Sequence, residues 1–204
     1  MVGNNSTSKC LLAEQESLYA IATMVSTRDY VVGANVLLYS LRKHLDPKFL
    51  PLVTFVALFI EGKSNDDILM NLDSGWQPCF VPLISPARPE DVKFERFKEQ
   101  FTKLALWRMV GFTRVLYLAS DTLAVGDFAP LLTNATKPFA AVRDWERGKV
   151  RDHFNMGVAS LAPNLSEFKR LDHLRLTKRD YRLEMAEQGL LNSVYGNELE
   201  EFPF

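Results

Sequence analysis

The chain has 204 residues, of which 47% are hydrophobic, and this is enough for one large domain or two small ones with a sizeable buried core. Its 24 lysines and arginines against 25 aspartates and glutamates leave a formal net charge of −1, without the basic bias of nucleic-acid-binding proteins. The longest apolar stretch, residues 52–60, is much shorter than the roughly 18 residues that a membrane span needs, so we expect neither a nucleic-acid partner nor a membrane span.

The first residues of the chain are polar. We expect a loose arm over residues 1–17, followed by one domain over residues 18–204. The arm lacks the hydrophobic core of a signal peptide, which favours a cytoplasmic location. Cys10 and Cys79 form no CxxC pair, so a thiolate zinc site is not supported. The two cysteines could form one disulfide, but we expect both thiols to be reduced.

Strand-like and helix-like patterns then alternate along the chain. Apolar runs predict buried strands over residues 19–25, 52–60, 79–83 and 115–118. Apolar residues at helical spacing predict helices over residues 30–43, 65–72 and 94–107. The first of these helices ends before Pro47, and the third ends at Gly111. This alternation predicts an α/β fold, a single domain with a mostly parallel sheet flanked by helices.

Several familiar site motifs are absent. No GxxxxGK[ST] loop occurs, and the loop after the first strand lacks GxGxxG, which argues against a P-loop site and a dinucleotide-binding Rossmann domain. The absence of HExxH and GxSxG argues against a zinc protease and an α/β-hydrolase. What remains are α/β folds that bind a nucleotide with few glycines.

The strand over residues 115–118 runs directly into Ala119, Ser120 and Asp121. In open α/β sheets, ligands bind at the carboxyl ends of the strands. A carboxylate at that place can hold a divalent cation that neutralises a diphosphate. The alternative is that Asp121 only caps or turns the chain.

Five short segments, taken in chain order, resemble one known family. They are Tyr19-Ala20-Ile21-Ala22-Thr23 with Tyr30 and Gly33-Ala34, then residues 101–107 (FTKLALW), 117–123 (YLASDTL), 154–158 (FNMGV) and 187–192 (EQGLLN). The resemblance is to glycosyltransferase family 8, the glycogenin and galactinol synthase group. It implies a single domain of the GT-A type, a uridine diphosphate (UDP) sugar as donor, and transfer of a hexose with retention of configuration to a carbohydrate or other hydroxyl acceptor.

The resemblance also implies roles for individual residues. The nucleotide-binding residues would be Met24, Ser26, Tyr30, Lys103, Ser120 and Asp121. The catalytic residues would be Lys103, Asp144, Glu187 and Gln188, with Asn155, Gly157 and Gly189 close to the sugar or the acceptor. Asp121 would bind manganese or magnesium. Two of these residues have structural alternatives, since Tyr30 could be a packing residue at a helix start and Lys103 a surface lysine. His153 is a further candidate ligand.

Two departures from the family pattern bear on activity. The family has aspartate at both ends of its DxD motif, whereas this chain has Ala119 at the first position. In a strand, positions 119 and 121 face the same way, so Ser120 cannot replace the missing carboxylate and metal binding should be weak. The family's late HxxGxxKPW segment has no counterpart before Phe204, which suggests an incomplete C-terminus.

These departures leave several hypotheses open. The chain is an active hexosyltransferase, or a non-catalytic UDP-sugar binder or partner subunit that retains the family fold. A truncated gene product is a third reading. A sugar nucleotidyltransferase is weaker, because its glycine-rich N-terminal loop is not found. A homodimer is a candidate assembly.

Overall fold

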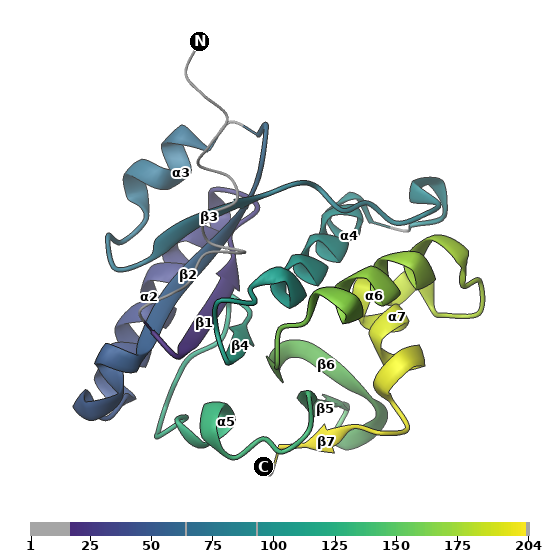
Figure 1. Cartoon of the computed structure of the whole chain (residues 1–204). Helices are drawn as coiled ribbons and strands as arrows, with labels where there is room; N and C mark the ends of the chain where they lie inside the picture. The colour runs from purple at the N-terminus through teal and green to yellow at the C-terminus, as the bar shows by residue number, and fades with distance from the viewer. Residues whose placement is uncertain (1–16, 64, 93, 203–204) are drawn as a thin grey trace.

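A computed structural model describes residues 17–63, 65–92 and 94–202. Within this described part, the strands form one seven-stranded sheet in the order β3-β2-β1-β4-β6-β5-β7 (Figure 1). The strands are β1 (Tyr19–Met24), β2 (Val53–Ile60), β3 (Gln77–Val81), β4 (Arg114–Leu118), β5 (Phe139–Glu146), β6 (Lys149–Leu161) and β7 (Glu200–Glu201).

Helices lie on both faces of this sheet. The α-helices are α2 (Asp29–His44), α3 (Asp66–Asn71), α4 (Glu95–Gln100), α5 (Pro130–Thr133), α6 (Leu165–Thr177) and α7 (Ala186–Tyr195). The 3-10 helices are η1 (Pro47–Leu52), η2 (Pro89–Asp91), η3 (Phe101–Arg108) and η4 (Leu183–Met185). In Figure 1, α2 lies on one side of the sheet, whereas α4, α6 and α7 lie on the other.

The sheet is mostly parallel, as predicted. Strand β1 pairs in parallel with β2 and β4, β2 with β3, and β5 with β7. Strand β6 is the exception, because it runs antiparallel to both β4 and β5. The parallel strands bring their carboxyl ends to one edge of the sheet, the edge where ligands bind in open α/β folds.

The hydrophobic core is divided by the sheet into two clusters. Side chains alternate along β1, so Ala20 and Ala22 belong to the cluster under η3 and α7, while Ile21 belongs to the cluster under α2. Burial on both faces explains why β1, β2 and β4 are continuous apolar runs that the sequence identifies correctly.

The helix predicted over residues 94–107 is correct only in part. Helix α4 ends at Gln100, and residues 101–108 form the 3-10 helix η3. Phe101, Leu104 and Trp107 follow each other at a spacing of three and are at most 1% exposed. A spacing of three suits the three residues per turn of a 3-10 helix better than the 3.6 of an α-helix.

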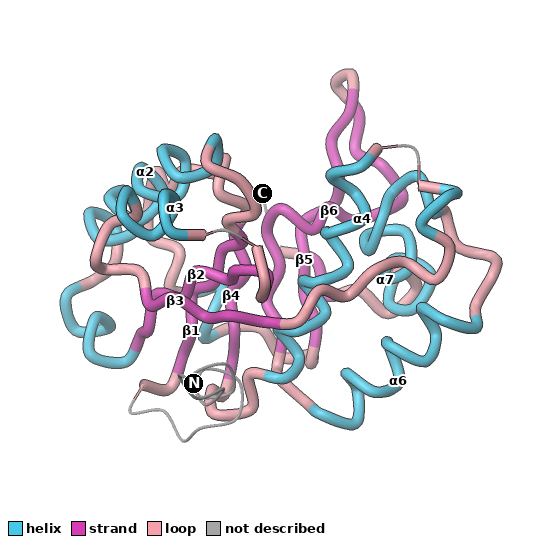
Figure 2. The backbone as a smooth tube through the Cα atoms, turned by 90° about the horizontal axis from the view of Figure 1, so that it is seen from above, coloured by secondary structure: helices cyan, strands magenta, loops and turns pink. Residues whose placement is uncertain are grey.

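The long hairpin of β5 and β6 is not among the predicted elements, because charged residues interrupt its apolar runs. Its turn contains Arg147 and Gly148 with φ angles of 52° and 76°, positive at both positions as in a type I′ hairpin turn. Figure 2 shows this hairpin projecting beyond the rest of the sheet.

Two further expectations concern the N-terminal arm and the cysteines. Most of the predicted N-terminal arm, residues 1–16, lies outside the described residues. The expected reduced thiol at Cys79 is wrong, since this buried residue is disulfide-bonded, while Cys10 lies outside the described residues. None of the helices in the described ranges is long and apolar enough to cross a bilayer.

One buried hydroxyl offers a test of the packing of β1. Thr23 is 0% exposed, and its Oγ1 has no hydrogen-bond partner among the described residues. An unpaired buried hydroxyl costs about 1–3 kcal/mol, whereas an apolar group of the same shape does not. Thr23→Val is therefore expected to raise the free energy of unfolding by about 1 kcal/mol in urea denaturation.

Thr102 is a matched control for this prediction, because it is also 0% exposed. Its Oγ1 accepts a hydrogen bond of 3.2 Å from the backbone N–H of Ile84. Thr102→Val should therefore lower the free energy of unfolding by about 1 kcal/mol. Changes of the same sign in the two variants would contradict the assignment of Thr23 as the unpaired residue.

Candidate functional site

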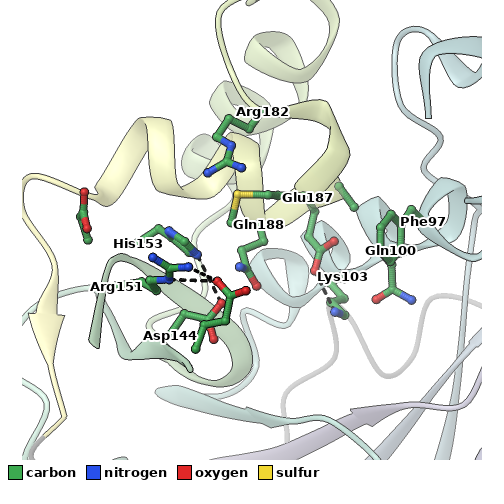
Figure 3. Close-up of a pocket in the computed structure, with 13 residues that line it drawn as sticks. Phe97, Gln100, Lys103, Asp144, Arg151, His153, Arg182, Glu187 and Gln188 are labelled. Atoms are coloured by element: carbon green, nitrogen blue, oxygen red, sulfur yellow. Dashed lines mark hydrogen bonds and ion pairs between the residues drawn. The ribbon is translucent and has the colours of Figure 1, made fainter. Parts of the chain in front are cut away.

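Three adjoining cavities share Lys103 as a lining residue. The third lies at the carboxyl ends of β1 and β4, the second lies between the loop after β4 and the hairpin of β5 and β6, and the first lies between that hairpin, η3 and α7. The first has a volume of about 560 Å³, the second about 530 Å³ and the third about 140 Å³. Asp144 and Gln188 line both the first and the second cavity, and Asp121 lines both the second and the third. Figure 3 shows the first cavity with Gln188 between Asp144 and the pair of Lys103 and Glu187.

Lys103 belongs to η3 and is held by a buried ion pair. Its Nζ lies 2.7 Å from Oε1 of Glu187 on α7, and the two side chains are only 10% and 3% exposed. Nζ also lies 5.2 Å from the centre of the Tyr117 ring on β4. The predicted alternative of a surface lysine is therefore wrong, because the side chain extends into the molecule rather than toward solvent.

This pair determines the charge of Lys103. Burial is the largest single influence on the pKa of Lys103 and lowers it, but the charges and hydrogen bonds of Glu187 and Tyr117 together outweigh burial and raise the pKa above its usual value. Burial raises the pKa of the Tyr117 hydroxyl, which therefore stays neutral. The site therefore presents a permanent positive charge at the junction of the three cavities.

Helix α7 is attached to β6 by side chains of the segment 187–192. Oε1 of Gln188 accepts a hydrogen bond of 3.0 Å from the N–H of Met156. Asn192 pairs with both backbone groups of Phe154, accepting from its N–H at 2.8 Å and donating to its carbonyl at 3.0 Å. These bonds fix Glu187 and Gln188 over the sheet, so the motif residues also have a structural role.

Asp144 on β5 and Asn155 on β6 form the facing wall. Nδ2 of Asn155 donates to Oδ1 of Asp144 at 3.3 Å, and its Oδ1 accepts from the N–H of Gly157 at 2.5 Å. Nε2 of His153 lies 3.3 Å from Oδ2 of Asp144. Asn155 thus contacts both Asp144 and Gly157, and His153 contacts Asp144 from the other side of its carboxylate.

The predicted nucleotide residues also come together. The third cavity is lined by Met24, Ser26, Tyr30, Gln100, Lys103, Tyr117, Ala119, Ser120 and Asp121. Gly33 on α2 explains how the helix meets the loop after β4, since a Cβ atom at Gly33 would lie 2.4 Å from the carbonyl oxygen of Ser120. Only glycine allows this approach, which closes the cavity beside Ser120.

The geometry around Ala119 differs from the predicted strand. Strand β4 ends at Leu118, and a turn follows in which the N–H and the hydroxyl of Thr122 both donate to the carbonyl of Ala119. Strand alternation therefore does not apply here. Ala119 and Asp121 nevertheless line the same two cavities, and Ser120 is buried at 4% exposure. A carboxylate at position 119 would thus face the cavities that Asp121 lines.

The residues around Asp121 do not form a cation site by themselves. The described residues contain no group of three or more histidine, cysteine, aspartate or glutamate side chains that could hold a metal ion. Asp121 is exposed, and Ala119 beside it supplies no ligand atom. One carboxylate does not fit the several oxygen ligands that manganese or magnesium requires, unless substrate phosphates supply the rest.

Of the two glycines expected near the sugar, Gly189 is required by a backbone contact, whereas Gly157 opposes a side chain. A Cβ atom at Gly189 would lie 2.0 Å from the carbonyl oxygen of Arg182. This oxygen belongs to the backbone and cannot rotate away. A Cβ atom at Gly157 would lie 2.8 Å from Oδ1 of Asn155, and this side chain can rotate away. Gly189 therefore allows α7 to pack closely on the preceding loop.

Several lining residues are not among the predicted ones. Arg151 on β6 and Arg182 before η4 line the first cavity, and Trp145 on β5 lines the second. The sequence around these three residues shows no periodic pattern that marks a site. The position of Trp145 next to Asp144 is the one signal that could have identified any of them.

Known proteins resemble this chain over most of its length. The chain is 32% identical to glycogenin-1 of Caenorhabditis elegans over 86% of its length, which is 39% of that protein. It is 28% identical to inositol phosphorylceramide glucuronosyltransferase 1 of Arabidopsis thaliana, over 89% of this chain and 31% of that protein. The chain is a homologue of the glycogenins. This relationship confirms the predicted resemblance to glycosyltransferase family 8.

Solved structures confirm the fold of this glycogenin homologue as that of the GT-A glycosyltransferases. The bifunctional glycosyltransferase WbbM matches 93% of the chain with a TM-score of 0.65 at 14% identity, covering 39% of WbbM. The galactosyltransferase LgtC, solved with donor and acceptor sugar analogs, matches 89% with a TM-score of 0.62 at 16% identity, covering 72% of LgtC. No family model matches the sequence. The chain spans about half or less of the length of its curated relatives.

Proposed function

We propose that this glycogenin homologue binds a UDP-sugar and transfers its hexose, with retention of configuration, to a hydroxyl acceptor. The observation that carries the proposal is the position of Lys103 at the junction of the three cavities. One end of the groove holds Tyr30 and Ser26, which suit a base and a ribose, and the middle holds Asp144 and Gln188, which suit sugar hydroxyls.

Lys103 would act on the leaving group. Glu187 keeps Lys103 protonated, so a positive charge is present before the donor arrives. Such a preorganised charge stabilises the negative charge that develops on a departing diphosphate. The metal contribution stays a prediction: Asp121 would contact manganese or magnesium weakly, because only donor phosphates could complete the ligand set.

A second candidate is a UDP-sugar binder without turnover, or a partner subunit of a transferase. Ala119 favours it, because this position lines the same cavities as Asp121 and brings no carboxylate. The two candidates share the nucleotide site and differ in chemistry. A cytoplasmic location and a homodimer stay predictions under either candidate.

Calorimetric titration of UDP, with and without manganese, tests both the site and its metal dependence. The parent chain should bind UDP with little response to manganese, because it offers a single carboxylate. In Ala119→Asp, manganese should strengthen UDP binding at least about fivefold, the lower range of coupling between two ligands. A parent that needs manganese to bind UDP would contradict this assignment of position 119.

Turnover separates the two candidates. Release of UDP from UDP-glucose, UDP-galactose or UDP-glucuronate by the folded parent, lost in Asp144→Asn, would establish a transferase. UDP binding without any release by the parent or by Ala119→Asp would support the binder. Absence of UDP binding in a folded sample would refute both.

A further inference from the structure

Trp145 differs from the other two tryptophans of the chain. Trp76 and Trp107 are 3% and 1% exposed and belong to the core, whereas Trp145 is 60% exposed. Trp145 lies on β5 opposite Val150 of β6, in the projecting hairpin of Figure 2. A large aromatic ring left in solvent beside a cavity is a candidate contact for a ligand.

The surroundings of Trp145 combine polar and apolar side chains. It lines the 530 Å³ cavity together with Asp144, Asn155 and Gln188, whose side chains carry carboxylate and amide groups. Oε1 of Gln188 is used by the N–H of Met156, while its Nε2 donates to no residue in the described part of the chain. The cavity therefore offers one aromatic face and several hydrogen-bonding groups on the wall around it.

This combination favours one class of ligand. A lipid chain requires a continuous apolar lining, whereas here Val142, Met156 and Val158 are interleaved with charged and amide side chains. A sugar ring has an apolar C–H face and a rim of hydroxyls, so it can pack on an aromatic side chain while its hydroxyls pair with polar groups. We propose that Trp145 is the stacking platform for a sugar ring of the acceptor, which makes the acceptor a carbohydrate; this inference rests on the proposed transferase function.

The order of groups along the groove assigns Trp145 to the acceptor rather than to the donor. The nucleotide end is the 140 Å³ cavity with Tyr30, which Trp145 does not line. A donor anchored there reaches the middle cavity by way of Asp121. Trp145 lies on the exposed hairpin of that middle cavity, where a second sugar enters from solvent.

Fluorescence gives a direct readout, because only Trp145 is exposed among the three tryptophans. A panel of maltotriose, lactose, chitobiose, xylobiose and cellobiose is added in the presence of saturating UDP. Stacking should shift the emission of the parent to shorter wavelength and protect it from acrylamide quenching with at least one sugar. The same sugar should bind Trp145→Ala at least about tenfold more weakly in saturation-transfer NMR. Truncating an aromatic side chain at the centre of a binding contact costs about 1.4 kcal/mol or more of binding free energy, which corresponds to this tenfold loss.

Two controls sharpen the test. Tyr39→Ala removes another exposed aromatic side chain, 70% exposed on α2, and should leave sugar binding unchanged. UDP affinity is measured in every variant, and Trp145→Ala should keep it within twofold of the parent.

Normal UDP binding with no sugar response across the panel, or an equal response in parent and Trp145→Ala, overturns the stacking proposal while the nucleotide site stands. Loss of UDP binding in the parent overturns the proposed function instead. A blue shift with vesicles of phosphatidylcholine and phosphatidylserine, but with no sugar, would assign Trp145 to a membrane surface.

Discussion

Lys103→Met is expected to lower the free energy of unfolding by about 3–5 kcal/mol, the usual effect of removing one partner of a buried ion pair. The variant leaves Glu187, whose side chain is 3% exposed, as an uncompensated charge under η3. Urea denaturation followed by circular dichroism measures the loss. The double variant Lys103→Met/Glu187→Leu should recover most of it, because an apolar pair of similar volume replaces the ion pair.

Lys63 supplies a matched surface pair for this prediction. It contacts Glu99, and the two side chains are 38% and 23% exposed. Exposed pairs contribute about 0–1 kcal/mol, so Lys63→Met should change stability by less than about 1 kcal/mol. A loss in Lys103→Met no larger than that in Lys63→Met would show that the interior tolerates Glu187 alone, and the account of the site would be wrong.

The same pair gives a pH dependence whose sign follows from the raised pKa of Lys103. A lysine with a raised pKa stabilises the fold fully below its unfolded pKa of about 10.4, and this contribution is lost as the pH rises through the folded pKa. The stability gap between parent and Lys103→Met should therefore be constant from pH 7 to about 10 and narrow at higher pH. Both proteins are compared in a Tyr117→Phe background, because Lys103 also lowers the pKa of Tyr117.

Gly189→Ala is the second variant with a large expected effect. The new methyl group would lie 2.0 Å from the carbonyl oxygen of Arg182, so α7 or the loop before it must move. Overpacking of this kind lowers stability by about 1–3 kcal/mol, and occasionally by more. Because α7 also carries Glu187 and Gln188, UDP affinity should fall together with the melting temperature.

Gly126→Ala is the control for this variant, since nothing lies within 4 Å of a Cβ atom at that position. It should leave both stability and UDP affinity unchanged within about 0.5 kcal/mol, as for most surface substitutions. If Gly189→Ala behaves like Gly126→Ala, α7 does not pack against Arg182 as described, and the placement of Gln188 over β6 loses its support.

The core strands were predictable because their pattern is local. Strands β1, β2 and β4 are buried on both faces, and such strands are continuous apolar runs that can be recognised without knowing their neighbours. The hairpin of β5 and β6 was not predictable in this way. Its residues Arg143, Asp144 and Arg151 face solvent or a cavity, so charges interrupt the apolar pattern, and the pairing with β6 shifts register after Ala141 and after Arg143.

The helical segment around Lys103 shows a different limit. Its apolar stripe identified a helix, but the change from α4 to η3 depends on packing on every side, since all residues from Phe101 to Trp107 are buried. Burial of Thr102 and Lys103 on the polar side of the stripe requires partners from elsewhere in the chain. Those partners are the N–H of Ile84 and the carboxylate of Glu187.

The sequence by itself determined the family resemblance, the α/β class and the residues that belong together at the site, because motif order and apolar period are properties of neighbouring positions. The contacts that those residues make with one another depend on the packing of distant segments. The tertiary structure placed Glu187 at 2.7 Å from Lys103 across 84 positions of sequence, and it left Trp145 exposed at the cavity while the other tryptophans entered the core. Such contacts depend on how distant segments pack, and no local pattern of residues encodes the distance between them.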